Sequence, residues 1–147
     1  MKYKGTILNN ETLKTSLQHY KNNANATTSN EILQEIMKST FIIPFIYNTT
    51  ETERKNIEKD PTLAENTPKK YILIQDTKGN LFHPIFTDNE EFEKLNPTLN
   101  KMILEFPEYL KLLFSEEENF TGIMINPKTH QFFLPKEILI NLTRIIQ

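Results

Sequence analysis

The chain has 147 residues, no cysteine, and a net charge of −2 in which acidic and basic residues are interspersed. The lack of cysteine excludes disulfides, thiolate zinc sites, iron–sulfur clusters and a cysteine nucleophile. Neither a basic stripe nor a signal-peptide core nor a membrane-length apolar run is visible. We therefore expect one domain, residues 1–147, that is soluble and cytoplasmic and binds neither nucleic acid nor membrane.

Residues 1–39 predict two amphipathic helices. Asn10 can cap the first helix, and a capping box of Thr28 and Glu31 can begin the second. Apolar residues recur at helical spacing in both segments: Leu13, Leu17 and Tyr20, then Ile32, Leu33, Ile36 and Met37. Such stripes ordinarily pack on the domain's own sheet, and a partner-binding helix is the alternative.

Residues 41–47 predict a strand that is interrupted by Pro44. Residues 48–69 then change in character, because they are rich in Asn, Thr, Glu and Lys and hold almost no large apolar residue. This composition predicts a long polar loop of the disordered type. A tolerated surface insertion is the first interpretation of the loop, and a recognition loop is the alternative.

The run 70–92 is the most informative stretch, because it predicts a strand, a tight turn, a second strand and a capped helix. Residues 71–76 are β-branched and aromatic, as in a mostly buried strand. Asp76 can bond forward to the backbone of the turn, and Gly79 can take the positive φ that the turn needs. The chain is therefore expected to reverse at this point.

The return strand, residues 81–86, contains Pro84, which lacks an N–H and so predicts an edge strand or a bulge. Two overlapping capping boxes then begin a short helix that stops before Pro97: Thr87 with Glu90, and Asp88 with Glu91. Capping and the helix dipole explain the carboxylates of this helix, Glu90, Glu91 and Glu93, and Glu90 can pair with Lys94.

Residues 101–106 predict another strand, and Pro107 suits the first turn of the helix that follows. That helix ends in a solvated acidic patch, residues 115–119. Residues 122–126 predict a short buried strand, with 131–134 as its hairpin partner.

The last helix is predicted to open at Pro135. Its residues expected to face inward are Ile138, Leu139, Leu142, Ile145 and Ile146.

No catalytic or metal-binding motif stands out. His83 lies near Asp76 in the sequence, and a metal cluster with His130 would form only through tertiary folding. No serine lies in a glycine-flanked elbow, and the three glycines are too few for a phosphate-cradling loop. We therefore predict a protein that is not an enzyme, with no catalytic residue, no metal and no cofactor.

The order of these motifs resembles the SseB-type domain, the N-terminal domain of the enhanced serine sensitivity family. The motifs are Ile42-Ile43-Pro44, the strand ending at Asp76 with its Lys78-Gly79 turn, the run from Pro84 to Glu91, and the run from Gly122 to Pro127 before a terminal helix. The resemblance covers nearly the whole chain. It implies an α+β domain with one mixed, mostly antiparallel sheet of about five to six strands and about five flanking helices.

The resemblance implies no catalytic residues, so the motif residues are expected to be structural. They are Pro44, Asp76, Gly79, Pro84, Phe86, Thr87, Asp88, Glu91, Gly122, Asn126 and Pro127. Family members are small bacterial proteins that occur alone or with a further C-terminal domain, which a chain ending at Gln147 is expected to lack.

Two functions remain open at this point. The first is a protein-binding domain, in its sharpest form an immunity or adaptor protein that acts on a toxin or a secretion-associated partner. The acidic residues counted as contacts for that partner are Glu90, Glu93, Glu116, Glu117 and Glu118. The alternative is a small-molecule binder or hydrolase with a cleft near His83, Asp76 and Thr87. The sequence identifies neither the partner nor the oligomeric state, because prolines blunt the strand edges that could support dimerisation.

Overall fold

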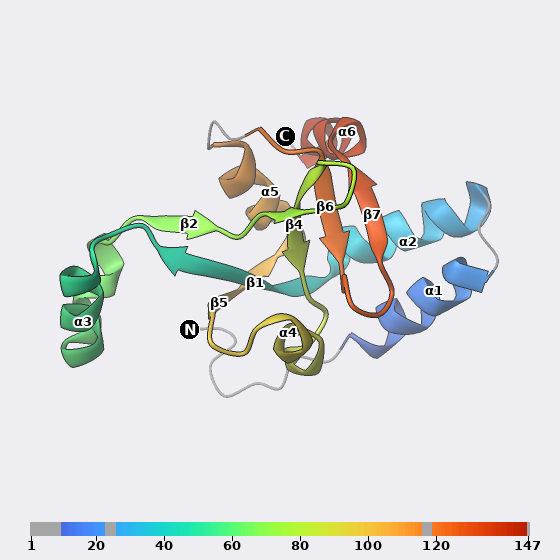
Figure 1. The fold of residues 1–147 in the computed structure, drawn as a ribbon. Helices are drawn as coiled ribbons and strands as arrows, with labels where there is room; N and C mark the ends of the chain where they lie inside the picture. Colours follow the sequence, from blue (N-terminus) through green and yellow to red (C-terminus); the bar gives the residue numbers. More distant parts are fainter. Residues whose placement is uncertain (1–9, 23–25, 116–118, 147) are drawn as a thin grey trace.

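The computed structural model describes residues 10–22, 26–115 and 119–146, which form an α+β fold (Figure 1). The fold class is therefore the predicted one. The described helices are α1 (Glu11–Asn22), α2 (Ala26–Lys38), α3 (Glu51–Lys59), the 3₁₀ helix η1 (Pro61–Asn66), α4 (Asn89–Leu95), α5 (Phe106–Phe114) and α6 (Lys136–Ile146). The described strands are β1 (Thr40–Tyr47), β2 (Lys69–Tyr71), β3 (Ile74–Gln75), β4 (Leu81–Ile85), β5 (Asn100–Glu105), β6 (Gly122–Ile125) and β7 (Phe132–Pro135).

These strands form two sheets rather than the single sheet that was expected. One has the order β2-β1-β5 and the other the order β3-β4-β6-β7. Only β4 and β6 pair in parallel among the described strands, and the other pairs are antiparallel. Within the described residues, one antiparallel bridge joins the two sheets, in which Ile42 and Phe86 exchange backbone hydrogen bonds of 2.9 and 3.0 Å.

Pro44 and Pro84 give a physical reason for the division into two sheets. If the pairing of Ile42 with Phe86 continued by two residues, Pro44 would lie opposite Pro84. Neither proline has an N–H, so the ladder between β1 and β4 stops after one bridge. Pro84 was expected to mark an edge strand or a bulge; β4 is not an edge strand, and neither is β1, which contains Pro44, because both lie inside their sheets. Each proline instead occupies a local gap in the pairing.

The predicted strand 71–76 is shared between the two sheets. Its start, β2, pairs with β1, and its end, β3, pairs with β4, so the chain crosses between the sheets at Ile72 and Leu73. The Nδ1 atom of His83 lies 2.8 Å from the carbonyl oxygen of Ile72. His83 therefore ties β4 to this crossing.

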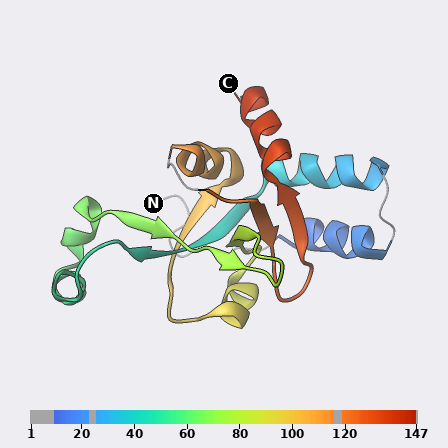
Figure 2. The same ribbon diagram turned by 45° about the horizontal axis from the view of Figure 1, so that its top comes forward.

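The prediction of a long polar loop for residues 48–69 was wrong, because that range contains α3 and η1. Thr50 caps α3 by accepting a hydrogen bond from the backbone N–H of Glu53 at 3.2 Å, and Asp60 caps η1 in the same way through the N–H of Thr62. Figures 1 and 2 show α3 at the opposite end of the molecule from α1 and α2. The structure describes all of α3, and only Ile57 in it is buried. For this reason the polar composition of the segment did not indicate a helix.

Two helix details also differ from expectation. Helix α2 starts at Ala26, so Thr28 lies inside its first turn rather than at its cap. In α6, Leu139 and Leu142 are buried as predicted, whereas Ile145 is 74% exposed and so does not face inward. Ile146 lies at the end of α6, where the side chain is outside the description.

The main hydrophobic core lies between the sheets and helices α1, α2, α5 and α6. A smaller cluster lies under α4, where Phe92 packs on Ile42 and Phe86 at the bridge between the sheets. No described helix combines the length and the hydropathy that a membrane span requires.

Candidate functional site

The two motif runs of the sequence meet at the carboxyl ends of β4 and β6. The parallel pairing of these strands sets Thr87 beside Asn126, and both are fully buried. The backbone N–H of Thr87 donates to Oδ1 of Asn126 at 3.1 Å, and Nδ2 of Asn126 donates to Oγ1 of Thr87 at 3.0 Å. Asn126 has a φ of 50°, a left-handed conformation that asparagine tolerates better than most residues. The side chains of these two motif residues thus bond across the ends of the two strands.

The same asparagine also fixes the protonation state of His130. Because the N–H of Thr87 can only donate, Oδ1 of Asn126 faces it and Nδ2 is left to face His130 Nδ1 at 3.0 Å. His130 Nδ1 must therefore accept, which requires the neutral ring. Burial lowers the pKa of His130 below its usual value, and Glu91 opposes this effect. The cations that also lower this pKa are Lys14, Lys21 and Lys94.

Asp88 begins α4 as its cap, as the second of the two capping boxes predicted. Its Oδ1 accepts from the N–H of Glu91 at 3.0 Å, and its Oδ2 lies 2.9 Å from Nζ of Lys14 on α1. Thr87 is not a cap, because its hydroxyl donates to Asp88 at 3.2 Å. Burial opposes the charge of Asp88, but the contacts with Lys14, Glu91 and Thr87 together bring its pKa below the usual value.

Glu91 points into the hairpin between β6 and β7. It is 3% exposed, and its oxygens accept from Lys94 at 2.9 Å and from the Thr129 hydroxyl at 2.6 Å. The prediction paired Lys94 with Glu90, whereas the structure pairs Lys94 with Glu91. Nζ of Lys21 donates to the Thr129 carbonyl at 2.9 Å, so the hairpin is held by both α1 and α4.

Asn10 completes this network and was predicted only as a helix cap. Its Nδ2 donates to the carbonyl oxygens of Thr40 and Thr87, each at 2.8 Å. Thr87 is 77 residues away in the chain. No local pattern in the sequence could have revealed this contact.

The cleft suggested near His83 is not supported by the geometry. His83 is 1% exposed, and its ring packs edge-on against Phe120 with the centroids 5.0 Å apart. Asp76 lies in the exposed turn before β4, where it accepts from the N–H groups of Lys78 and Asn80, each at 2.9 Å. Thr87 lies beyond the other end of β4. The three residues therefore occupy three separate places.

The remaining predicted residues are placed as follows. Gly79 has a φ of 88° and serves the turn as expected. Glu90 and Glu93 are exposed on α4, whereas Glu116, Glu117 and Glu118 lie outside the described residues. Within the described part of the chain, no three His, Asp or Glu side chains are grouped closely enough to hold a metal ion.

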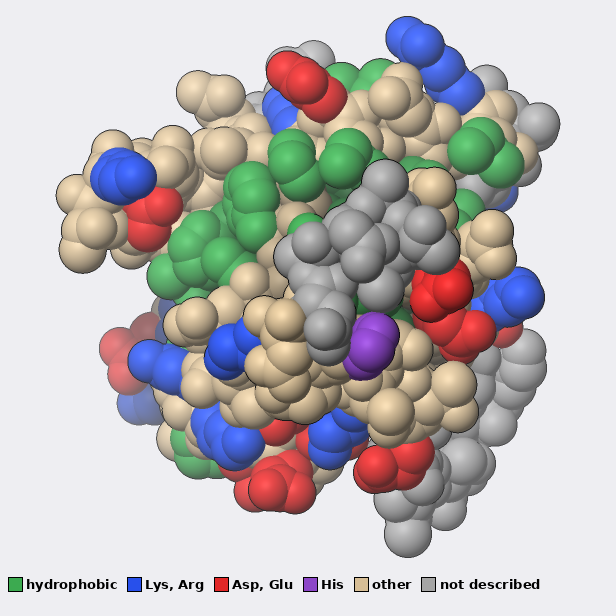
Figure 3. Space-filling view, turned by 90° about the vertical axis from the view of Figure 1, so that its right-hand side faces the viewer, with side chains coloured by type: hydrophobic (Ala, Val, Ile, Leu, Met, Phe, Trp, Pro, Cys, Tyr) green, Lys and Arg blue, Asp and Glu red, His purple; other side chains and the backbone are tan. Residues whose placement is uncertain are grey.

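The outer face of the β3-β4-β6-β7 sheet is apolar. Ile123, Ile125 and Leu134 point into the core and are 1% exposed or less. Alternation along the strands therefore directs Met124 and Phe133 to the opposite face, and cross-strand pairing adds Ile74, Phe82 and Pro84. We call these five residues the open face; Phe82 and Pro84 within it are buried, Ile74 and Met124 are half-buried, and Phe133 is the exposed member. Figure 3 views the molecule from the side where α1 and α2 lie in Figure 1 and shows hydrophobic side chains gathered in a band across that side.

A hollow of about 290 Å³ lies on the open face. Phe82, Met124 and Phe133 form its apolar wall. Its polar rim consists of Thr121 and of turn residues Asp76, Thr77, Lys78 and Asn80. Gly122 lies beside it, and a Cβ there would come within 2.3 Å of the Leu134 carbonyl and 2.8 Å of the Phe133 ring. The motif glycine thus makes room for Phe133.

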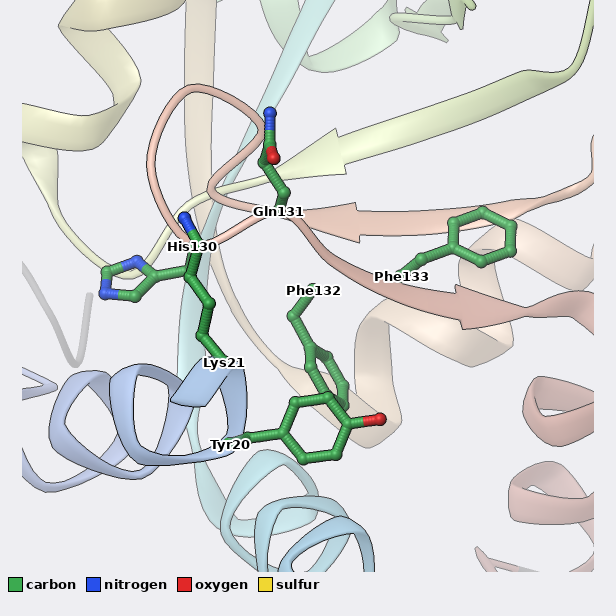
Figure 4. Close-up of a pocket in the computed structure, with 6 residues that line it drawn as sticks. All are labelled: Tyr20, Lys21, His130, Gln131, Phe132 and Phe133. Atoms are coloured by element: carbon green, nitrogen blue, oxygen red, sulfur yellow. The ribbon is translucent and has the colours of Figure 1, made fainter. Parts of the chain in front are cut away.

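A second hollow, of about 380 Å³, lies between the end of α1 and the β6–β7 hairpin. Figure 4 shows that Tyr20 and Phe132 face each other there, whereas His130, Gln131 and Phe133 point in three different directions. Side chains that diverge in this way do not form a catalytic constellation. We interpret this hollow as a surface groove.

The fold and the site define a class of protein, namely an α+β domain in which the motif residues at the strand ends bond to one another. The family model described as SseB protein N-terminal domain matches residues 13–139. The chain therefore belongs to the SseB family. Comparisons with curated proteins and with solved structures returned no match.

Proposed function

We propose that this chain is a protein-binding domain without a catalytic role and that it holds its partner on the open face. The observation that carries the proposal is Phe133, a large aromatic side chain that is 36% exposed beside the hollow. Antiparallel strands that face solvent on one side ordinarily carry polar residues there. An apolar outer face with a polar rim is the pattern of an interaction surface.

The chemistry of the face indicates the kind of partner. Phe82 and Met124 form an apolar floor, and methionine adapts its shape to a bound side chain. Lys78 and Asp76 place opposite charges on the rim. A protein that inserts one large apolar side chain between polar neighbours fits this surface, and the buried aromatic anchor would supply most of the affinity.

In its sharpest form the role is that of an immunity or adaptor protein, acting in the cytoplasm on a toxin or a secretion-associated partner. The engagement of the motif residues in structural bonds supports binding over catalysis. His83 is buried, so it lines no cleft that would support the hydrolase alternative. A toxin or secretion gene next to the gene of this chain would favour the sharper role.

Affinity capture from native lysate with the variant Phe133→Ser tests the surface. We expect the wild-type chain to retain a stoichiometric protein partner and Phe133→Ser to lose it. Leu63→Ser is the matched control, because Leu63 is 45% exposed on η1, outside the open face. Melting curves check that both variants are folded. Lack of any stoichiometric partner, or equal retention by Phe133→Ser, would refute the proposal.

A further inference from the structure

Phe133 lines both of the hollows described above, which we call the face hollow, of about 290 Å³, and the hairpin groove, of about 380 Å³. Its ring lies over Gly122 on the open face, where a Cβ would come within 2.8 Å of the ring. Figure 4 shows Phe133 pointing away from Tyr20 and Phe132, which face each other in the hairpin groove. Phe133 is therefore a wall shared by two hollows, each of which contains a further aromatic side chain.

A short peptide is long enough to reach from one hollow to the other. The face hollow begins at Phe82 on β4, and Phe133 lies two strands away on β7. Since neighbouring strands lie about 4.8 Å apart, this part of the path is roughly 10 Å long. In the hairpin groove the Tyr20 and Phe132 rings have their centroids 5.1 Å apart. The whole path is thus roughly 15–20 Å, which five or six extended residues span at about 3.3 Å each.

An exposed ring between two hollows suits an extended segment better than a helix. Phe133 is 36% exposed, so a chain that uses both hollows has to cross it and place side chains on either side of the ring. An extended chain does this with a few residues, because its backbone is narrow and its side chains alternate in direction. A helix is about 10–12 Å wide with its side chains and presents one straight row of them, which would meet the ring itself.

A lysine lies at each end of this path, and among the described residues no carboxylate forms an ion pair with either of them. Lys78 is exposed on the turn at the rim of the face hollow. Asp76 attracts it, but the oxygens of that carboxylate already accept from the Lys78 N–H and from the N–H and side-chain amide of Asn80. Lys21 lines the hairpin groove, and its ammonium donates to the carbonyl of Thr129. Both ends of the path therefore favour a carboxylate from outside.

We propose that the partner binds the open face through an extended acidic segment of about six residues that crosses Phe133 and fills both hollows. One apolar side chain of the segment enters the face hollow, and a second lies on Tyr20 in the hairpin groove. Carboxylates at the two ends of the segment pair with Lys78 and Lys21. This inference rests on the proposed function and adds to it the chemistry of the segment that the partner supplies.

The attraction between the two partners is local. The chain has a net charge of −2, so its overall charge does not draw in an acidic segment. At physiological salt, exposed charges more than about 8 Å apart are largely screened, so Lys78 and Lys21 act only on the carboxylates next to them. Binding is therefore expected to weaken as the salt concentration rises. A segment with the same apolar residues and basic ends is expected to bind poorly.

Selection of random linear peptides displayed on phage, with the full chain as the target, tests this inference. We expect the selected peptides to carry two large apolar residues with Asp or Glu on both sides. Fluorescence anisotropy of a synthetic selected peptide then measures its affinity. Lys78→Glu and Lys21→Glu are each expected to weaken binding at least about fivefold, and Phe133→Ser to abolish it. Replacing the acidic residues at one end of the peptide by lysine should restore its binding to the corresponding lysine variant.

Lys55→Glu, on the exposed surface of α3, is the matched control and is expected to bind the peptide as the wild-type chain does. Melting curves establish that the variants are folded. Selection that enriches no peptide, or peptides without acidic ends, would overturn the inference, and so would equal affinities for Lys78→Glu and Lys55→Glu. The proposed function would survive these results if capture from lysate still required Phe133. Capture that Phe133→Ser leaves unchanged would refute the proposed function and this inference together.

Discussion

Replacing Asn126 by alanine removes the side chain that joins the two motif runs. The backbone N–H of Thr87, fully buried, loses its acceptor, and a buried donor without a partner costs about 1–3 kcal/mol. Loss of the bond to the Thr87 hydroxyl adds about 1 kcal/mol. Alanine at a φ of 50° adds at least about 1 kcal/mol more. We expect Asn126→Ala to lower the free energy of unfolding by about 3–5 kcal/mol, a large part of what a domain of this size has.

Urea unfolding followed by far-UV circular dichroism measures this loss. We expect a lower midpoint and an unchanged slope, because the surface exposed on unfolding stays the same. Asn126→Gly is the matched variant, since glycine removes the side chain but accepts the left-handed backbone. Its stability should exceed that of Asn126→Ala by about 1 kcal/mol. If Asn126→Ala loses less than about 1 kcal/mol, the bonds to Thr87 do not stabilise the fold as argued.

Two further predictions concern the strand ends and the open face. Gly122→Ala places a methyl group 2.3 Å from the Leu134 carbonyl. We therefore expect the free energy of unfolding, measured by thermal melting, to fall by about 1–3 kcal/mol or more. An unchanged melting temperature would contradict the close packing. For His130 the folded pKa is lowered, so the folded state prefers the neutral ring. Its contribution to stability is full above the usual pKa near 6.5 and declines as the pH falls below that value. His130→Gln should flatten this part of the stability profile, and an identical profile for the variant and the wild type would refute the assignment.

Local chemistry made the run 70–92 predictable. A turn with Asp76 and Gly79 needs only residues within the turn, and the cap at Asp88 needs only the residue three positions on. Signals of this kind act over a few residues and survive in most tertiary contexts. The boundary between β5 and α5 was likewise placed within one residue by Pro107.

The composition of residues 48–69 was a misleading guide to their structure. Helix α3 buries little apolar surface, so its helical pattern has no hydrophobic stripe to reveal it. Its start was nevertheless encoded, because Thr50 and Glu53 have the spacing of a capping box, and the Thr50 side chain accepts from the Glu53 N–H and donates to the Glu53 carboxylate, each at 3.2 Å. Capping signals deserve weight even where the following segment is polar.

The candidate site depends on contacts that span long distances in the chain. Asn10, Lys14 and Lys21 reach the strand ends from α1, and their spacing in the sequence relates only to their own helix. The motif residues Thr87 and Asn126 were identified, but their mutual bonding follows from the parallel pairing of β4 with β6. Strand order is a property of the whole fold, so no local pattern reveals it.

The opposed prolines connect the fold to the proposed function. Had Pro44 and Pro84 been other residues, the ladder from Ile42 and Phe86 could continue and join β1 to β4 along their length. The two sheets would then merge into one. Because the ladder stops at the bridge, each sheet keeps its own outer strands and faces. The open face proposed for a partner therefore belongs to the sheet that contains β4 alone, and the sheet that contains β1 keeps a separate face.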